Sequence, residues 1–325
     1  MGRQPMKDRS DASNRAHWTG FGRYLIDRMP LRKRRLAVTC LLATGAALDM
    51  YAASAESLLA RGKYLMNAVV ACGNCHTTVD KNNTPIPGME LAGRDRQLPE
   101  GTYWTNPNIT PDPETGIGKW TDQQIIDVLR LGKKPDGTLV TARMPIELFR
   151  TISDRDVKAI VAYLRSIPAV KHYVHPTHSR LDPPAPPGGY GPSVSVPEVQ
   201  LTNRVLYGGY LARIAHCMDC HTPGDFGKKD YEHRLGAGGA MFTRWQDGTV
   251  YNVSLNITPD PVAGIGRWTD QQIKDAITKG ERPGGGTLRF PMAFFYYQNM
   301  KSDDVDAIVT YLRSLPPMKG IGLAQ

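Results

Sequence analysis

The sequence predicts a helical, loop-rich protein built from two tandem copies of one small domain. The first observation behind this prediction is a block of residues that recurs at a constant offset of 148, from Asn108 to Asn256 and again from Pro168 to Pro316. The second is that each copy carries apolar residues at helical spacing next to helix-capping residues. Dense self-similarity at one offset is typical of a duplicated domain.

Three helices are expected in each copy. The first, over residues 57–70, has an apolar stripe of Leu58, Leu59, Leu65, Met66 and Val69. The second begins at a capping box formed by Thr121 and Gln124 and stops at Gly132. The third begins after Ser153 and repeats apolar residues at i, i+3, i+4 and i+7. Those residues are Val157, Ile160, Val161 and Leu164, matched in the second copy by Val305, Ile308, Val309 and Leu312. Prolines and glycines predict loop between residues 77 and 102.

Each copy contains the pentapeptide Cys-x-x-Cys-His, the attachment site of a c-type haem. The two thiols add across porphyrin vinyl groups as thioethers, and the adjoining histidine supplies one axial ligand to the iron. The sequence therefore predicts two covalently bound haem c groups. Their attachment residues are Cys72 and Cys75 for the first and Cys217 and Cys220 for the second, with His76 and His221 as iron ligands.

Two methionines are candidates for the sixth iron ligand. Met144 and Met292 lie 148 residues apart, each in the loop between the capped helix and the final helix. A thioether is a soft ligand that favours ferrous iron. Core packing is the alternative role, because methionine commonly fills gaps in cores. Met89, Met241 and Met300 are the rival candidates.

Among the other aromatic side chains, some could contact the haem or pack in the core, and the rest are expected to have only a structural role. Trp120 and Trp268 either pack in the core or donate an indole N–H to a haem propionate. Tyr64 and Tyr210 precede the pentapeptides at nearly matched distances and are expected to pack the first helix against the last. His216 is expected at the surface or at an edge.

A proline- and glycine-rich stretch over residues 169–200 predicts an extended linker. His172, His175 and His178 within it are spaced by three, but the flanking prolines argue against a helical metal site. A solvated linker is the favoured interpretation. The expected organisation is a signal peptide or N-terminal anchor (1–55), domain 1 (56–168), linker (169–200), domain 2 (201–316) and a C-terminal tail (317–325).

The charge of the chain is concentrated at its N-terminus. The formal net charge is +9, and residues 1–55 hold ten Lys/Arg against four Asp/Glu. The other residues carry 40 − 10 = 30 basic and 31 − 4 = 27 acidic side chains. Basicity therefore does not indicate a nucleic-acid partner.

That N-terminal segment has the pattern of a secretory signal. A basic run, Arg32–Arg35, precedes 13 apolar residues at 36–48 and the sequence Ala53-Ser54-Ala55. The apolar run, which holds the fifth cysteine, Cys40, is shorter than the roughly 20 residues of a spanning helix. An uncleaved anchor is the alternative, and translation from Met29 would give a signal of ordinary length. We expect a periplasmic protein, either soluble or bound to the outer face of the bacterial inner membrane.

Together these features resemble class I cytochrome c domains. More narrowly, the paired pentapeptides, the loop methionines and the segments Asn-Ile-Thr-Pro-Asp-Pro and Gly-Ile-Gly-(Lys/Arg)-Trp-Thr-Asp resemble the cytochrome c subunits of membrane-associated bacterial dehydrogenases. Those enzymes oxidise alcohols, gluconate or related sugars, or are molybdenum hydroxylases. The resemblance covers nearly all of residues 56–316 and implies an all-α fold with three main helices around each haem. Members are often tri-haem, whereas this chain has two haem motifs.

Electron transfer is the function this resemblance implies, and a closed His/Met iron suits it because no position is open for substrate. The chain would pass single electrons from a dehydrogenase subunit to an oxidase, a quinone or a soluble cytochrome, and would not itself be an enzyme. A di-haem peroxidase is the alternative, because such enzymes carry two similarly spaced motifs, but it needs a displaceable distal ligand and acid/base groups. A structural subunit whose haems only stabilise the fold is a third interpretation.

Overall fold

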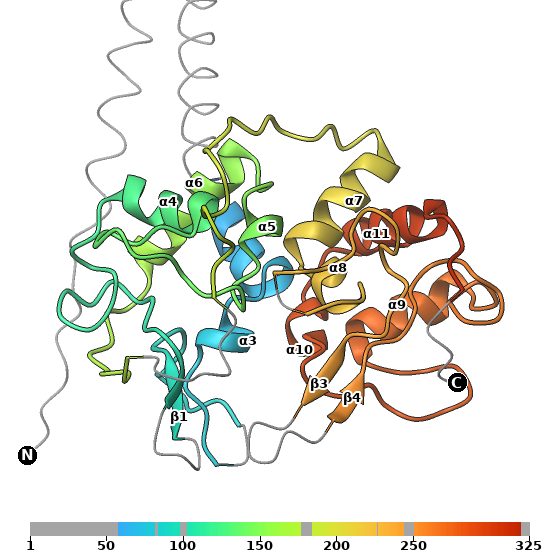
Figure 1. Ribbon diagram of the computed structural model, residues 1–325, viewed down its shortest axis with the longest axis horizontal. Coiled ribbons are helices and arrows are strands. Elements are labelled where there is room, and N and C mark those ends of the chain that lie inside the picture. Colours follow the sequence, from blue (N-terminus) through green and yellow to red (C-terminus); the bar gives the residue numbers. More distant parts are fainter. Residues whose placement is uncertain are drawn as a thin grey trace, which may run out of the picture. The chain divides into compact units, whose positions relative to one another are not determined.

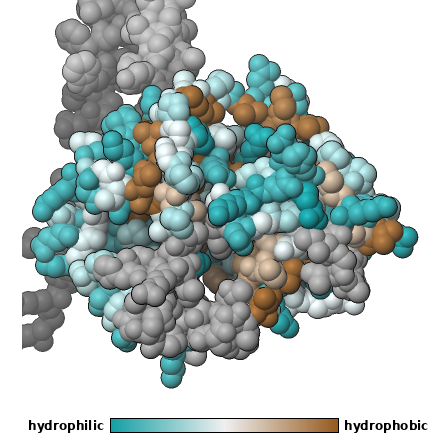
Figure 2. All heavy atoms as spheres, in the orientation of Figure 1, coloured by the Kyte–Doolittle hydropathy of each residue, from teal (hydrophilic) through white to brown (hydrophobic). Residues whose placement is uncertain are grey.

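The computed structural model of the protein describes residues 58–81, 84–97, 103–176, 184–225, 227–243 and 250–319. These residues all belong to one unit, Leu58–Gln325. The targeting segment expected over residues 1–55, Cys40 within it, and His178 lie outside the described ranges. In the described ranges, no helix is both long and apolar enough to cross a membrane. On the face drawn in Figure 2, apolar side chains gather in small groups among hydrophilic ones.

In the first repeat, the capped helices form where the sequence predicts. Helix α4 (Asp122–Leu131) begins with both halves of the capping box, since the Gln124 amide donates to Thr121 Oγ1 and the Thr121 amide donates to Gln124 Oε1. Gly132 ends α4 in the left-handed conformation, with φ 63°. In helix α6 (Asp154–Ser166), the Ser153 hydroxyl accepts the Asp156 amide at 3.1 Å. All four stripe residues of α6 are buried, as predicted.

The second repeat copies these elements (Figure 1). Helix α9 (Asp270–Lys279) has the same capping box, and the predicted stripe of α11 (Ser302–Ser314) is buried. Short helices α3 (Gly73–His76) and α5 (Ile146–Phe149) correspond to α8 (Cys217–Cys220) and α10 (Phe294–Tyr297). The duplication read from the sequence is therefore a duplication of structure.

The helix before the first pentapeptide contains a π-helical turn. Residues 58–64 are helical and continue into η1 (Leu65–Val69), whereas the matching helix α7 (Arg204–Ile214) is regular. Gly62 is ten residues before Cys72, but Gly208 is nine before Cys217. A π-helical turn accommodates one inserted residue and changes the helical phase. Leu59, placed on the buried stripe by a 3.6-residue period, is accordingly 44% exposed, so that prediction was wrong.

Each repeat also contains a short antiparallel hairpin. Strand β1 (Arg94–Gln97) pairs with β2 (Tyr103–Asn106), and β3 (Met241–Thr243) pairs with β4 (Val250–Val253). The fold is mostly helical, but the all-α prediction and the loop expected over residues 77–102 need this correction. Strands of three or four residues are too short to show the alternation by which a sequence reveals a strand.

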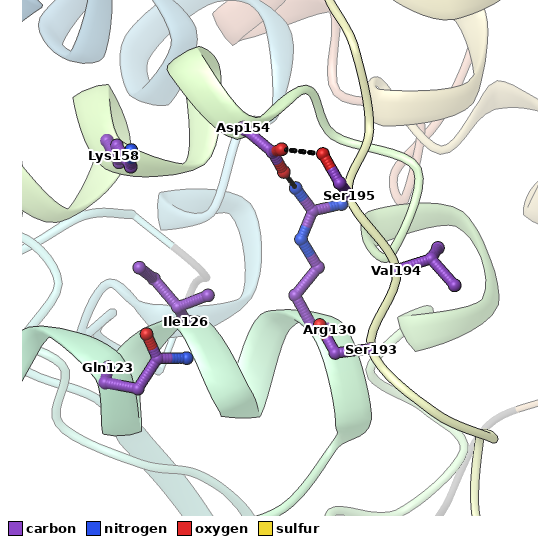
Figure 3. Close-up of a pocket in the computed structure, with 8 residues that line it drawn as sticks. All are labelled: Gln123, Ile126, Arg130, Asp154, Lys158, Ser193, Val194 and Ser195. Carbon is purple, nitrogen blue, oxygen red and sulfur yellow. Dashed lines mark hydrogen bonds and ion pairs between the residues drawn. The ribbon is translucent and has the colours of Figure 1, made fainter.

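The linker is docked on the first repeat. Without regular secondary structure, residues 190–198 follow the surface formed by α4, α5 and α6. The Asp154 carboxylate accepts the Ser195 hydroxyl at 2.5 Å and pairs with Arg130 at 2.8 Å, and the Val196 carbonyl accepts the Asp154 amide. Figure 3 shows the contacts of Asp154 with Ser195 and Arg130, which line a small surface pocket.

The histidines at the start of the linker are also held. His172 Nδ1 lies 2.8 Å from the Ala92 carbonyl, and His175 contacts the Asp95 carboxylate while stacking on the Tyr103 ring. These contacts correct the expectation of a solvated linker. They attach the segment to the hairpin of the first repeat.

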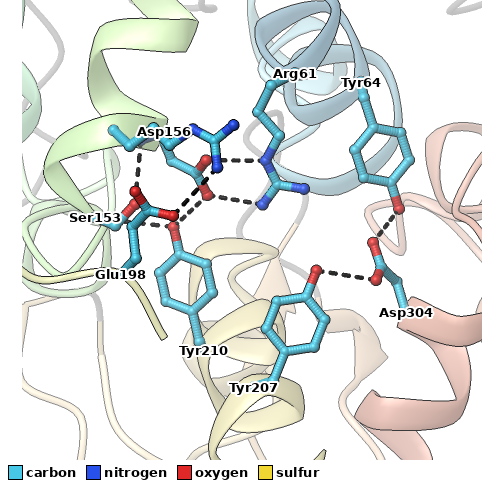
Figure 4. Close-up of polar contacts among 9 residues, drawn as sticks. Arg61, Tyr64, Ser153, Asp156, Glu198, Tyr207, Tyr210 and Asp304 are labelled. Atoms are coloured by element: carbon cyan, nitrogen blue, oxygen red, sulfur yellow. Dashed lines mark hydrogen bonds and ion pairs between the residues drawn. The ribbon is translucent and has the colours of Figure 1, made fainter. Parts of the chain in front are cut away.

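A nearly symmetric polar network joins the two repeats (Figure 4). Tyr64 donates to Asp304 at 2.5 Å, and Tyr210 donates to Asp156 at 2.7 Å. Arg61 binds Asp156 within the first repeat, as Tyr207 binds Asp304 within the second. The two tyrosines therefore join a first helix to the final helix of the other repeat. The sequence predicted the type of contact but could not show that it crosses between the copies.

Candidate haem sites

Each pentapeptide forms a single helical turn that follows a sharp bend. Ala71 and His216, the residues just before the two motifs, have φ of 52° and 47°. In both turns the histidine amide donates to the carbonyl of the first cysteine at 2.9 Å. Residues three apart on a helix share a face, so each turn presents its two sulfurs together. Burial raises the pKa of the Cys72 and Cys217 thiols to about 12, so both are neutral at physiological pH.

The two pentapeptide histidines are oriented in the same way. His76 Nδ1 lies 2.8 Å from the Pro107 carbonyl, and His221 Nδ1 lies 2.7 Å from the Leu255 carbonyl. A carbonyl only accepts, so Nδ1 carries the proton and Nε2 keeps its lone pair for a metal. Burial lowers the pKa of both imidazoles, which favours the neutral form that binds iron.

The Asn-Ile-Thr-Pro-Asp-Pro segments hold those carbonyls in place. Asn108 directly follows Pro107, and its side-chain oxygen accepts the Thr110 amide at 2.9 Å and the Thr110 hydroxyl at 2.7 Å. Its amide group donates to the Val170 carbonyl at 2.8 Å. Asn256 makes the corresponding contacts with Thr258 and the Met318 carbonyl. Each of these segments, called the clip below, therefore fixes the position of the backbone carbonyl that orients the histidine.

A glycine before each hairpin permits the chain to pass close to this clip. The Gly93 amide donates to the His76 carbonyl, and the Gly238 amide donates to the His221 carbonyl. Both glycines have positive φ, and a Cβ on either would lie 2.5 Å from the amide nitrogen of the clip asparagine. Another residue would therefore push the clip away from the histidine.

Two arginines, to which the sequence analysis assigned no role, attach the following turn to the last helix. Arg165 binds the Asp122 carboxylate and donates to the carbonyls of Ile117 and Trp120. Arg313 makes the same three contacts in the second repeat. The offset of 148 between the two arginines was the signal that could have revealed them.

The candidate sixth ligands occupy matched positions. The Met144 amide donates to the Thr141 carbonyl and the Met292 amide to the Arg289 carbonyl, both at 3.2 Å. Both side chains are half-buried against the core, two residues before the short helices α5 and α10.

The rival methionines, Met89, Met241 and Met300, do not occupy matched positions in the two repeats. Met241 is 66% exposed on strand β3, whereas Met300 is buried in the core. Met89 is half-buried, and its carbonyl accepts the amides of Thr78 and Ala92. Trp120 and Trp268 are half-buried against the core, which agrees with packing and leaves their proposed propionate contact a prediction.

Each attachment turn (the helical turn of one pentapeptide) contacts the other repeat, the first at the loop that holds Met292 and the second at helix α5 and the end of the first helix. Asn74 in the first turn donates to the Pro291 carbonyl beside Met292 at 3.1 Å. His216 before the second turn meets the ring of Phe149 edge-on and hydrogen-bonds to the Val70 backbone. His216 is therefore half-buried at the contact between the repeats, whereas the sequence favoured an ordinary position at the surface or at an edge. Burial lowers its pKa to about 4.

Two thiols and an oriented imidazole in each repeat form the set of side chains that covalent attachment of haem c requires. The chain belongs to the cytochrome c family, whose family model, described as Cytochrome c, matches residues 59–168 and again 208–316. The family implies one covalently bound haem c in each matched domain.

Known relatives carry the same domain. The chain is 28% identical over 294 residues to the cytochrome c subunit of a quinone alcohol dehydrogenase from Gluconobacter oxydans, covering 83% of this chain and 57% of that protein. It is 29% identical over 282 residues to a fructose dehydrogenase cytochrome subunit from Gluconobacter japonicus, covering 79% and 52%. A diheme cytochrome c-type protein from Cereibacter sphaeroides is 28% identical over 263 residues, covering 76% and 83%. The chain thus spans just over half the length of the two dehydrogenase subunits.

Proposed function

We propose that this protein is an exported di-haem cytochrome c that relays single electrons from a dehydrogenase to a respiratory acceptor. The observation that carries the proposal is the duplicated site: each repeat orients a neutral histidine through a backbone carbonyl and places a methionine in a matched loop. The relatives named as dehydrogenase cytochrome subunits support the choice of donor. An oxidase, a quinone or a soluble cytochrome would be the acceptor.

Corresponding residues would bind the haem in the same way in both repeats. Bound haem c supplies a one-electron couple. In the first repeat, Cys72 and Cys75 would hold it by thioether bonds, and His76 Nε2 and the Met144 sulfur would coordinate the iron. In the second repeat, the corresponding residues are Cys217, Cys220, His221 and Met292.

The rigid support of the histidines favours electron transfer over peroxide chemistry. In each repeat, the clip asparagine and the glycine before the hairpin both restrain the position of the imidazole. Little movement of this ligand is therefore expected when the iron changes oxidation state. A peroxidase needs a displaceable ligand at one haem, yet both repeats have a methionine at the matched loop position with the same backbone hydrogen bond. The similarity to dehydrogenase cytochrome subunits lends the peroxidase alternative no support.

The proposal places the protein in the periplasm. Residues 1–55 would be the export signal or an anchor on the outer face of the inner membrane, followed by domain 1 at 56–168, the linker at 169–200, domain 2 at 201–316 and a short tail. The covalent attachment of haem c on the far side of the bacterial cytoplasmic membrane agrees with export.

The test combines haem content with reduction by a donor. Purified mature protein should carry two haems per chain, and the double substitution of Cys72 and Cys75 by serine should leave one. Membranes of the source organism supplied with an alcohol, gluconate or fructose should reduce the haems, and membranes without substrate serve as the control. A high-spin haem together with hydrogen peroxide turnover, and no substrate-dependent reduction, would overturn the proposal.

A further inference from the structure

The two attachment turns differ in the charges beside them. Arg94, 6% exposed, follows the hairpin glycine of the first repeat and donates to the Asn74 carbonyl inside the attachment turn at 2.8 Å. The residue after the matched glycine of the second repeat is Gly239. At this position the first repeat therefore has a buried guanidinium, whereas the second repeat has no side chain.

A second cation adjoins the methionine loop of the first repeat. Arg143 directly precedes Met144, whereas the residue before Met292 is Pro291. Although desolvation raises the pKa of the Cys75 thiol, the charges of Arg94 and Arg143 act to lower it, and the charge of Asp219 in the second repeat opposes them less strongly. Both guanidinium groups thus act electrostatically on the first attachment turn.

The second turn contains a buried carboxylate instead. Asp219 lies between Cys217 and Cys220, is 7% exposed, and occupies the position that Asn74 holds in the first turn. Its carboxylate accepts the Tyr231 hydroxyl at 3.4 Å. Beyond the effect of desolvation, the charge of Asp219 raises the pKa of Cys220, and the half-buried Lys229 opposes it.

These charges act oppositely on a one-electron couple. Reduction adds one negative charge, so a nearby cation stabilises the reduced form and a nearby carboxylate destabilises it. Burial strengthens both effects because the interior screens charge less than water does. The first site has two positively charged arginines. The second site has a carboxylate, and the positive charge of Lys229 offsets its negative charge only in part.

We propose that Arg94, Arg143 and Asp219 give the haem of the first repeat the higher reduction potential, so that electrons enter at the second repeat and leave from the first. The inference rests on the proposed electron relay and adds its direction. The dehydrogenase would therefore dock on the second repeat and the respiratory acceptor on the first. The contacts of Asn74 with Pro291 and of His216 with Phe149 bring the two sites of the relay into contact.

The test is a spectroelectrochemical titration of the mature holoprotein. Two one-electron waves are expected, with at least a tenfold preference of the first electron for the upper site, equivalent to about 59 mV. Asp219→Asn, which introduces the amide found in the first turn, should raise the lower potential more than the upper one, because Asp219 also acts, less strongly, on Cys75 of the first turn. Arg94→Gln should lower only the upper potential, and Arg94→Lys, which keeps the charge, should restore most of it.

A matched control removes the same charge at a distance. Asp303→Asn at the exposed start of α11 should leave both waves in place. The proposal fails if the two potentials coincide, or if Asp219→Asn raises the upper potential more than the lower one, which would reverse the assignment. Asp219→Asn alone decides the assignment if Arg94→Gln does not fold. Substrate-dependent reduction by a dehydrogenase is measured separately, so a relay with the opposite direction is distinguishable from no relay at all.

Discussion

The contact between the first and last helices of each repeat predicts a large effect of a single methyl group. A Cβ on Gly208 would lie 1.8 Å from the Ala307 carbonyl oxygen and 2.4 Å from its carbon. Gly62 repeats the arrangement against Ala159, at 1.9 Å and 2.6 Å. The obstacle in each case is backbone, which no rotamer change can remove. Helices α7 and α11 would have to separate by about 1.7 Å to restore ordinary contact distances of roughly 3.5 Å.

The expected cost of Gly208→Ala follows from two opposing effects. Overpacking typically costs about 1–3 kcal/mol, and the upper end applies because the clash is with backbone. Alanine regains about 1 kcal/mol of helix propensity relative to glycine. We therefore expect the free energy of unfolding to fall by about 2 kcal/mol, which changes the folded-to-unfolded ratio roughly 30-fold.

Guanidinium unfolding of the holoprotein, followed by circular dichroism, measures this loss. Gly209→Ala is the matched control on the same helix, because its Cβ would meet a Tyr311 ring carbon at 2.9 Å rather than backbone. That ring can turn aside, so the control should cost less than about 1 kcal/mol. Equal stability of the two variants would refute the argument that backbone contact makes glycine necessary at position 208.

Three further predictions concern the sixth ligands, the contact between repeats and acid stability. Met144→Leu and Met292→Leu should each remove about half of the sulfur-to-iron absorption band and let carbon monoxide bind one reduced haem; an unchanged band would assign the ligand elsewhere. Tyr64→Phe and Tyr210→Phe should each lower the free energy of unfolding by about 2 kcal/mol, because each removes a hydrogen bond to a carboxylate. The double variant should unfold in two calorimetric steps, and one unshifted transition would show that the network contributes little. The lowered pKa of His216, about 4 against an ordinary 6.5, means that the unfolded chain binds more protons between those pH values. Stability should therefore fall by about 3 kcal/mol as pH drops from 6.5 to 4, and a His216→Gln variant that keeps the full acid slope would contradict this.

Much of the chain could be predicted because the relevant information is local. Capping boxes, a glycine stop and a 3.6-residue stripe act within one or two turns of helix, and α4, α6, α9 and α11 formed as expected. The pentapeptides are equally local, since two thiols and an imidazole need only one turn to come together. The offset of 148 then identified Met144 and Met292 as a pair without any knowledge of the fold.

The first helix shows where local periodicity is insufficient. The exposed Leu59 follows from a π-helical turn, and that turn is visible only when the distances from Gly62 to Cys72 and from Gly208 to Cys217 are compared. The short hairpins escaped prediction for a related reason. Their stability comes from pairing across a loop, not from the residues of either strand alone.

The sequence by itself therefore determined two haem-attachment turns, their histidines, the duplicated helices and a matched pair of methionines. Only the tertiary structure decided that Tyr64 reaches Asp304 and Tyr210 reaches Asp156, and that Arg94 is buried against one attachment turn while Asp219 is buried within the other. The physical reason is that a side chain shows its chemistry in the sequence, whereas its partner and its exposure to water depend on segments that only folding brings together. Here those two properties turn equivalent repeats into sites with different charge environments.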